Sequence, residues 1–229
     1  MKKIWIMLWA AVLASNVWAD TYSYTGGTYI AITNHTTSAL GSVGDYLNTM
    51  KVTGTLTTAA PLAANLAGAN VTAQITAYSF SDGLTTFAST DANTRLYSNV
   101  IVSTNAIGQI IGLDALIERW QTGSAPHAVN DRFDYILISG AATNAYHNDK
   151  CGVIGVSPSG VADSCTSNPS DTNTSTAGSG GGGVWSGPVA GTVSTVPTLS
   201  EWGVIILTFF IGMFGMAQSR RRHKQTAQM

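Results

Sequence analysis

An apolar run near the end of the chain limits the folds open to this protein, because it has the composition of a membrane-spanning segment. Residues 204–217 contain no charged side chain, and Arg220, Arg221 and Arg222 follow them. As a helix, this run and the two residues before it would measure about 24 Å, against about 30 Å for the hydrocarbon core of a bilayer. Long arginine side chains and local thinning of the bilayer can bridge the difference. We therefore predict a transmembrane helix over residues 204–218, in preference to a buried core helix, and a basic cytoplasmic tail over residues 219–229.

A short proline-containing motif lies directly before the run. It reads Val196, Pro197, Thr198, Leu199, Ser200, Glu201, Trp202 and Gly203. Proline fixes its own backbone torsion and lacks an N–H group, so the chain around Pro197 should stay extended and accessible to a protease. Trp202 falls where an indole suits the membrane interface. The motif, the apolar run and the arginine cluster together resemble the IPTL-CTERM protein-sorting domain, a relative of the PEP-CTERM signals that exosortase-type membrane proteases recognise in Gram-negative bacteria.

The resemblance covers residues 196–224 and concerns the destination of the protein. The matching motif residues are Val196, Pro197, Thr198, Leu199, Trp202 and Gly203, with Val196 at a position where isoleucine is usual. The resemblance implies an exosortase-like sorting protease as partner, an inner-membrane tethered intermediate with a periplasmic body, and delivery to the cell surface or extracellular matrix. These residues would be recognised by the protease and would catalyse nothing themselves.

The amino-terminal residues carry a second targeting signal. Two lysines precede an apolar stretch from Ile4 to Ala14, and residues 17–19 fit the positions that a signal peptidase reads. We expect cleavage before Asp20, which makes residues 1–19 a signal peptide. Cleavage after Ala14 and an uncleaved anchor are the alternatives, although the apolar stretch is short for a membrane span.

The charge of the remaining body argues against nucleic-acid binding. Residues 20–200 comprise 181 residues, enough for one domain with a hydrophobic core. They carry eleven acidic and five basic side chains, a formal charge of −6. Because binding to phosphate backbones depends on Lys and Arg, we expect no nucleic-acid partner.

The two cysteines of the chain, Cys151 and Cys165, follow the secretory signal. In an oxidising compartment such a pair most simply forms a disulfide, worth about 3 kcal/mol for a loop of this size. The alternative is a pair of metal-binding thiols, which would lack the paired spacing and neighbouring histidines of zinc sites. We predict the disulfide.

Thr, Ser, Ala, Gly and Tyr dominate the body, a composition that favours strands and turns. The predicted strands cover residues 21–25, 28–32, 50–56, 71–80, 96–103, 111–120 and 133–138. Gly26 and Gly27 should join the first two in a tight hairpin. A helical period also fits residues 111–120, although we prefer a strand, and residues 59–68 are either a short helix or a turn. Residues 20–165 are therefore predicted to be an antiparallel β-sandwich or jelly-roll-like domain.

The composition changes after Cys165. Residues 166–195 consist mainly of Ser, Thr, Asn, Pro and Gly, and they include four consecutive glycines, residues 180–183. Such a chain has little apolar surface to offset the entropy of ordering it. We predict a flexible linker over residues 166–195, and no phosphate-binding loop, because no Lys-Ser/Thr pair follows the glycines.

No catalytic or metal-binding motif is evident in the body. The sequence around Ser157 superficially resembles a nucleophile elbow, but its spacing is wrong. Two combinations of the body's histidines and aspartates are candidate sites: His127–Asp131–His147 and, for calcium, Asp131–Asp134–Asp149. His35 is a loop residue in this interpretation. We favour ordinary solvated or salt-bridged side chains, and therefore predict no catalytic residue, no metal and no cofactor.

The body also contains many aromatic side chains that could stack on sugars. They are Tyr22, Tyr24, Tyr29, Tyr46, Tyr78, Tyr97, Trp120, Tyr135 and Tyr146. In an alternating β-domain most of them should pack in the core or at strand edges. We expect a non-enzymatic, exported surface or matrix protein. The alternative is a secreted carbohydrate-binding module or a small hydrolase that uses the region of Asp131, Asp134 and His147; extracellular polysaccharide is a further expected partner.

Overall fold

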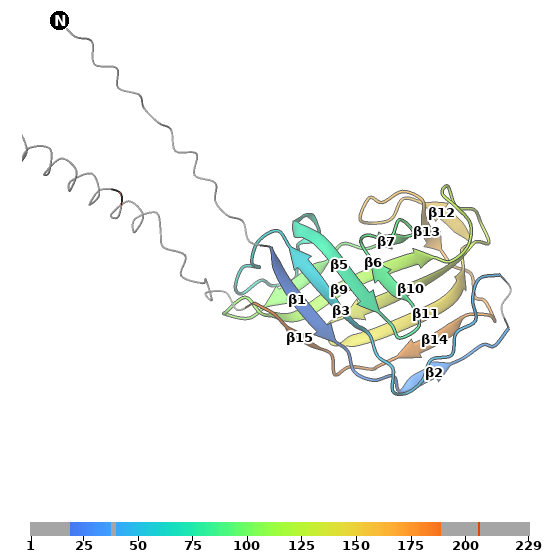
Figure 1. The fold of residues 1–229 in the computed structure, drawn as a ribbon, viewed down its shortest axis with the longest axis horizontal. Coiled ribbons are helices and arrows are strands. Elements are labelled where there is room, and N and C mark those ends of the chain that lie inside the picture. Colours follow the sequence, from blue (N-terminus) through green and yellow to red (C-terminus); the bar gives the residue numbers. More distant parts are fainter. Residues whose placement is uncertain (1–18, 38–39, 189–205, 207–229) are drawn as a thin grey trace, which may run out of the picture. The chain divides into compact units, whose positions relative to one another are not determined.

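The alternation of threonine, tyrosine and apolar residues produces antiparallel strands, as the computed structural model in Figure 1 shows. The structure describes residues 19–37, 40–188 and 206. Within the first two of these ranges the chain forms strands and one short 3₁₀ turn, η1 (Thr72–Gln74), and no α-helix. The prediction of a mainly β, antiparallel body is confirmed. The described residues 19–37 and 40–188 belong to one compact unit.

The first sheet contains five strands in the order β15-β1-β3-β5-β6. Their bounds are β1 (Asp20–Thr25), β3 (Thr53–Thr58), β5 (Ile75–Ser81), β6 (Thr86–Ala88) and β15 (Val184–Ser186). In β1, Tyr22 and Tyr24 are buried, whereas Thr21 and Ser23 are exposed. Because successive side chains of a strand point to opposite faces, this alternation gives the sheet one apolar face.

The second sheet follows the order β2-β14-β11-β10-β9-β8-β4, with β7 also paired to β9. Its bounds are β2 (Ala31–Thr33), β4 (Ala69–Asn70), β7 (Thr94–Leu96), β8 (Ile101–Thr104), β9 (Ile110–Trp120), β10 (Arg132–Ser139), β11 (Ala142–Lys150) and β14 (Ser175–Gly178). The predicted strands over residues 111–120 and 133–138 are both confirmed, and they are the central strands β9 and β10.

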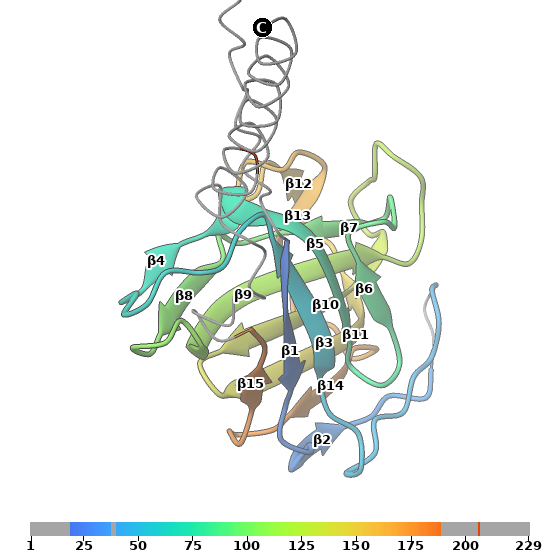
Figure 2. The same cartoon turned by 60° about the vertical axis from the view of Figure 1, so that its left-hand side comes forward.

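The two sheets enclose the main hydrophobic core. In both Figure 1 and Figure 2 the strands β1, β3 and β5 lie over β9, β10 and β11. Leu56 and Phe80 of the first sheet share one buried cluster with Ile117, Ile136 and Ala145 of the second. The aromatic and aliphatic side chains of the two inner faces therefore stabilise the pairing of the sheets by removing apolar surface from water.

A second, smaller hydrophobic cluster lies beside a third pair of strands. The strands β12 (Val153–Gly155) and β13 (Ser164–Ser167) form a hairpin, which the disulfide between Cys151 and Cys165 holds closed. The two cysteines are buried with Trp120 and Phe133. The predicted disulfide is therefore confirmed, and the hairpin that it closes covers the ends of β9 and β10.

The predicted hairpin at Gly26 and Gly27 is wrong. β1 pairs with β3 and β15 in the first sheet, whereas β2 pairs with β14 in the second. Neither glycine takes a positive φ angle. A Cβ atom on Gly27 would lie 2.1 Å from the carbonyl oxygen of Gly181, so this glycine permits a close approach of two backbone segments. The segment carries the chain from one sheet to the other.

The predicted flexible linker is wrong for residues 166–188. Ser175–Gly178 form β14, which lies between β11 and β2, and Val184–Ser186 form β15 beside β1. Backbone hydrogen bonds to existing strands need no apolar side chain, so a glycine- and serine-rich segment can still extend a sheet. Residues 59–68 form turns.

Several predicted segments lie outside the described residues. These are the signal peptide except Ala19, the sorting motif over residues 196–203, the tail over residues 219–229, and the transmembrane helix over residues 204–218 except Ile206. In the part of the chain that the structure describes, no helix is long and apolar enough to span a membrane.

Candidate functional site

A pocket of about 440 Å³ opens beside the ends of β9, β10 and β11. Arg119, Gln121, Asp134 and His147 come from these strands or directly after them, and Ser42 comes from the loop that precedes β3. Segment 84–91 supplies the remaining lining residues. The pocket thus combines residues that are far apart in the sequence.

An irregularity in the pairing of β10 with β11 places the two central residues. The register shifts between Phe133 and Tyr135, so that Asp149 faces Phe133 but Tyr146 faces Tyr135. Asn148, in the bulge, takes a positive φ of 60° and donates its backbone N–H to Asp134 Oδ1 at 2.8 Å. A bulge bends a strand locally and redirects its side chains, and this one brings Asp134 beside His147.

Asp134 is buried and held by several donors. Its side chain is 1% exposed. Thr85 Oγ1 donates to Oδ2 at 2.8 Å, Gln121 Nε2 donates to Oδ1 through a short hydrogen bond, and His147 Nδ1 lies 3.1 Å from Oδ1. A buried carboxylate is stable when its oxygens accept this many hydrogen bonds.

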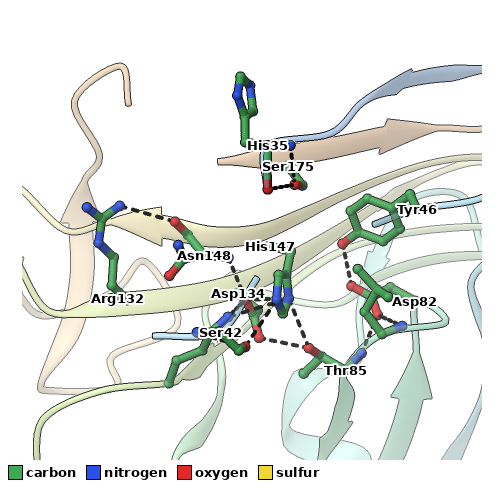
Figure 3. Close-up of polar contacts among 12 residues, drawn as sticks. His35, Ser42, Tyr46, Asp82, Thr85, Arg132, Asp134, His147, Asn148 and Ser175 are labelled. Atoms are coloured by element: carbon green, nitrogen blue, oxygen red, sulfur yellow. Dashed lines mark hydrogen bonds and ion pairs between the residues drawn. The ribbon is translucent and has the colours of Figure 1, made fainter. Parts of the chain in front are cut away.

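His147 lies between Asp134 and Ser42, as Figure 3 shows. Its Nε2 atom lies 3.2 Å from Ser42 Oγ, on the side of the ring opposite Asp134. Burial lowers the pKa of the imidazole, but the hydrogen bond and charge of Asp134 and the charge of Asp82 outweigh it, so the pKa of His147 is raised above 6.5.

The loop that carries Ser42 lies directly against the imidazole. Gln121 Oε1 accepts hydrogen bonds from Ser42 N–H at 2.7 Å and from Ser42 Oγ at 3.0 Å. A Cβ atom on Gly44 would lie 2.6 Å from His147 Cδ2 and 2.8 Å from Nε2. Glycine at position 44 is therefore what lets the loop approach closely enough for Ser42, an exposed residue, to reach His147.

A second buried carboxylate, that of Asp82, holds the turn that carries Thr85. Asp82 is fully buried, and it accepts hydrogen bonds from Tyr46 OH at 2.7 Å and from the backbone N–H groups of Leu84 and Thr85 at 2.8 Å and 2.6 Å. Burial is the main cause that raises the pKa of Asp82. These bonds, also drawn in Figure 3, fix the turn that positions Thr85 against Asp134.

The pocket also contains an ion pair that is open to solvent. Arg119 Nε lies 2.7 Å from Asp91 Oδ2, and both side chains are about a third exposed, at 31% and 29%. Burial tends to raise the pKa of Asp91, but the backbone N–H of Asn93 and the charge and hydrogen bond of Arg119 hold it below its usual range. The pocket can thus accept both polar and charged groups.

The residues that the sequence singled out do not form one site. His127 stacks on Trp120 with ring centroids 4.3 Å apart, and its Nδ1 lies 2.7 Å from Asp163. Asp131 accepts the backbone N–H of Ala128. His147 is separate from both, so the combination His127–Asp131–His147 is not assembled.

Of the other combinations, Asp134 and His147 of the hydrolase alternative meet at 3.1 Å, whereas the calcium combination Asp131–Asp134–Asp149 is not assembled. Asp149 accepts hydrogen bonds from Asn168 Nδ2 at 2.6 Å and from Thr174 Oγ1 at 2.9 Å. Among the described residues, no group of three or more acidic, histidine or cysteine side chains is placed to hold a metal ion. His35 contributes its backbone N–H to Ser175 Oγ at 2.9 Å.

Most of the aromatic side chains are unavailable to a ligand. Tyr22, Tyr24, Tyr29, Tyr46 and Trp120 are all buried. Tyr135 and Tyr146 are half-buried and stack on each other with centroids 4.1 Å apart, so each covers one face of the other. A stacked pair offers less ring surface to a sugar than two free rings do.

Sequence reasoning named Asp134 and His147 but missed Ser42, Thr85, Gln121 and Asp82. Ser42 lies between Gly41 and Gly44, and flanking glycines are the one local signal of a loop that approaches another segment closely. Its distance in the sequence from His147, 105 positions, gives no sign that the two side chains meet.

Comparison with known proteins adds information on the carboxyl-terminal end. Residues 196–223 match the family model of the IPTL-CTERM motif. The chain carries a C-terminal sorting signal of this type. The resemblance of the sequence to IPTL-CTERM tails is confirmed. No curated protein and no solved structure matches the chain.

The IPTL-CTERM motif bears on location and processing. A signal of this kind indicates an exported protein of the cell envelope or surface, and it implies processing by an exosortase-like enzyme. The match covers residues 196–223 and does not include any residue of the pocket around His147. The chemistry of the pocket must be argued from its own geometry.

Proposed function

We propose that this chain is an exported protein that its IPTL-CTERM signal holds briefly at the inner membrane before an exosortase-like protease acts near residues 196–203. The match of residues 196–223 to the motif carries this proposal. The body then reaches the cell surface or the extracellular matrix, where polysaccharide is the expected surrounding material. The tethered stage rests on the apolar run over residues 204–217 and on the arginines that follow it.

The body has properties that suit such a location. Its disulfide between Cys151 and Cys165 is formed, and disulfides persist in exported proteins. Its two sheets and their shared core fit a β-sandwich, which we propose as the description of residues 20–188. The expectation of a body without enzymatic activity stays a prediction, and the geometry around His147 provides a specific test of it. Four of the eight tyrosines, Tyr22, Tyr24, Tyr29 and Tyr46, are buried, which argues against the carbohydrate-binding alternative.

The sorting proposal is tested by intact-mass analysis of the protein in an exporting host. Three mass changes are expected: loss of residues 1–19, loss of two hydrogens in the disulfide, and loss of the tail by a cut near residues 196–203. The double variant Pro197→Ala, Trp202→Ala should keep Arg220 to Met229 and remain with the membrane. Val196→Ile, which restores the residue usual in such motifs, serves as the matched control and should be processed normally. Unchanged processing of the double variant would contradict the proposal.

A further inference from the structure

We propose that Ser42, His147 and Asp134 form a site for nucleophilic acyl transfer, acting on esters of short carboxylic acids. The inference does not depend on the sorting signal, because it concerns only the pocket in the body. It stands in place of the expectation that the body is not an enzyme, and the experiment below decides between the two.

The three side chains are connected in the order that such catalysis requires. Ser42 Oγ is 3.2 Å from His147 Nε2, and His147 Nδ1 is 3.1 Å from Asp134 Oδ1. A nucleophile within hydrogen-bond reach of a base, and a base held by a third group, is the geometry shared by unrelated serine hydrolases. Recognition of such a site depends on geometry and not on order in the sequence, which here is Ser, Asp, His.

Asp134 is held in a position from which it can orient the imidazole of His147. It is almost fully buried, and it accepts hydrogen bonds from Thr85 and from the backbone of Asn148 in addition to the imidazole. An acceptor at Nδ1 keeps the proton of a neutral imidazole on that nitrogen, so Nε2 is left as the base. Nε2 is the atom that faces Ser42.

The hydroxyl of Ser42 has two acceptors within reach, and protonation of His147 selects between them. When His147 is protonated, Nε2 carries a proton and the hydroxyl donates to Gln121 Oε1. When Nε2 is unprotonated, it accepts the hydroxyl proton while Gln121 Oε1 retains the bond from Ser42 N–H. Activity should therefore appear as the pH rises through the pKa of His147.

The reaction is balanced without a redox partner. Ser42 Oγ attacks the carbonyl carbon, and its proton passes to His147 Nε2. The bond between the carbonyl carbon and the alcohol oxygen breaks, and the alcohol leaves with that proton. Water then attacks the acyl group on Ser42, gives its proton to Nε2, and releases the carboxylic acid as Ser42 regains its hydrogen.

The walls of the pocket indicate the class of substrate. A pocket of about 440 Å³ has the size of a small-molecule site. Leu84 and Ala88 offer limited apolar surface, which suits a short acyl chain. Arg119 and Asp91 suit a polar, hydroxylated alcohol, and Arg119 provides a positive charge for the carbonyl oxygen as negative charge develops on it.

The test uses the full chain, purified in detergent, with a fluorophosphonate probe and with p-nitrophenyl acetate. Mass mapping should locate one adduct on Ser42, and the labelling rate should rise with pH through a midpoint above 6.5, since the pKa of His147 is raised. Ser42→Ala should abolish labelling. His147→Gln and Asp134→Asn should slow labelling and ester hydrolysis by at least about 100-fold.

The matched control is Ser139→Ala, an exposed serine at the end of β10, which should label like the wild type. Ser42 is also exposed, so its variant should keep the thermal transition of the wild type and exclude misfolding as the cause. Folded wild-type protein that gives no adduct on Ser42 at pH 8 would overturn the proposal. Labelling that persists in Ser42→Ala would overturn it as well. Neither result would affect the sorting proposal, which processing of the tail tests separately.

Discussion

The carboxylate of Glu118 lies beneath the disulfide-closed hairpin and accepts the backbone N–H of Cys165, with 3.3 Å to each carboxylate oxygen. Glu118 is 1% exposed, and burial raises its pKa from 4.5 to about 7, although Ser164, Cys165 N–H and the charge of Arg95 act in the opposite direction. We therefore expect the stability of the body around β12 and β13 to depend on pH.

Replacing Glu118 with Gln should remove this dependence. Because the folded-state pKa is raised, the folded protein holds the proton more tightly, and stability falls as pH rises from 4.5 to about 7. Gln cannot ionise, so relative to the wild type the variant should gain up to about 3 kcal/mol between pH 4 and pH 8. Urea unfolding at both values measures the difference. Asp114→Asn, an exposed acid on the same strand, should show little change, and an equal effect of Glu118→Gln at both pH values would refute the assignment.

Replacing Cys151 and Cys165 with serine should destabilise the body by about 3 kcal/mol, the chain-entropy value for a loop of this length. The disulfide closes the hairpin over Trp120, which is 1% exposed. Fluorescence of Trp120 should therefore shift toward that of a solvated indole in the folded variant, and reduction of the wild type should reproduce the shift. A variant with wild-type stability and emission would show that the hairpin docks without the disulfide.

The sequence predicted the central strands but not the whole sheet. Residues 111–120 largely alternate apolar with polar or small side chains, and residues 133–138 form the most apolar stretch of the body, so both segments carry a strand signal in the sequence. Residues 175–178 lack such a signal because β14 joins β11 and β2 through its backbone. The composition of a segment indicates how much apolar surface it can bury. It does not indicate whether the backbone of the segment forms hydrogen bonds with neighbouring strands.

The candidate site could be predicted only in part for a related reason. Asp134 and His147 are unusual residue types on long strands, so they stand out in the sequence. Their proximity depends on the bulge at Asn148, which no residue pattern marks. Ser42 reaches them through a loop, and its position follows from the packing of Gly44 against the imidazole.

Asp171 offers a test of whether residues 166–188 are folded. It pairs with Arg132, with side-chain exposures of 8% and 5%. Removing one partner of a buried ion pair leaves an uncompensated charge, so Asp171→Ala should cost about 3 kcal/mol of unfolding free energy. Asp91→Ala, which breaks the partly exposed pair with Arg119, should cost less than about 1 kcal/mol. Equal, small effects of the two variants in denaturant titrations would mean that residues 166–188 contribute little to the fold.

Gly44→Ala should separate the position of the Ser42 loop from the stability of the body. The added Cβ would lie 2.6 Å from His147 Cδ2 and 2.7 Å from Leu84 Cδ1, so the loop or the imidazole must move. Because Ser42 Oγ is already 3.2 Å from Nε2, a shift of a few tenths of an ångström weakens that contact. Labelling of Ser42 by a fluorophosphonate should fall by about 10-fold or more, as expected when a reacting group is misplaced. Gly112→Ala in β9, whose nearest neighbour is 4.0 Å from the added atom, is the control and should label normally. If both variants label like the wild type, the close approach of Gly44 does not position Ser42 for reaction.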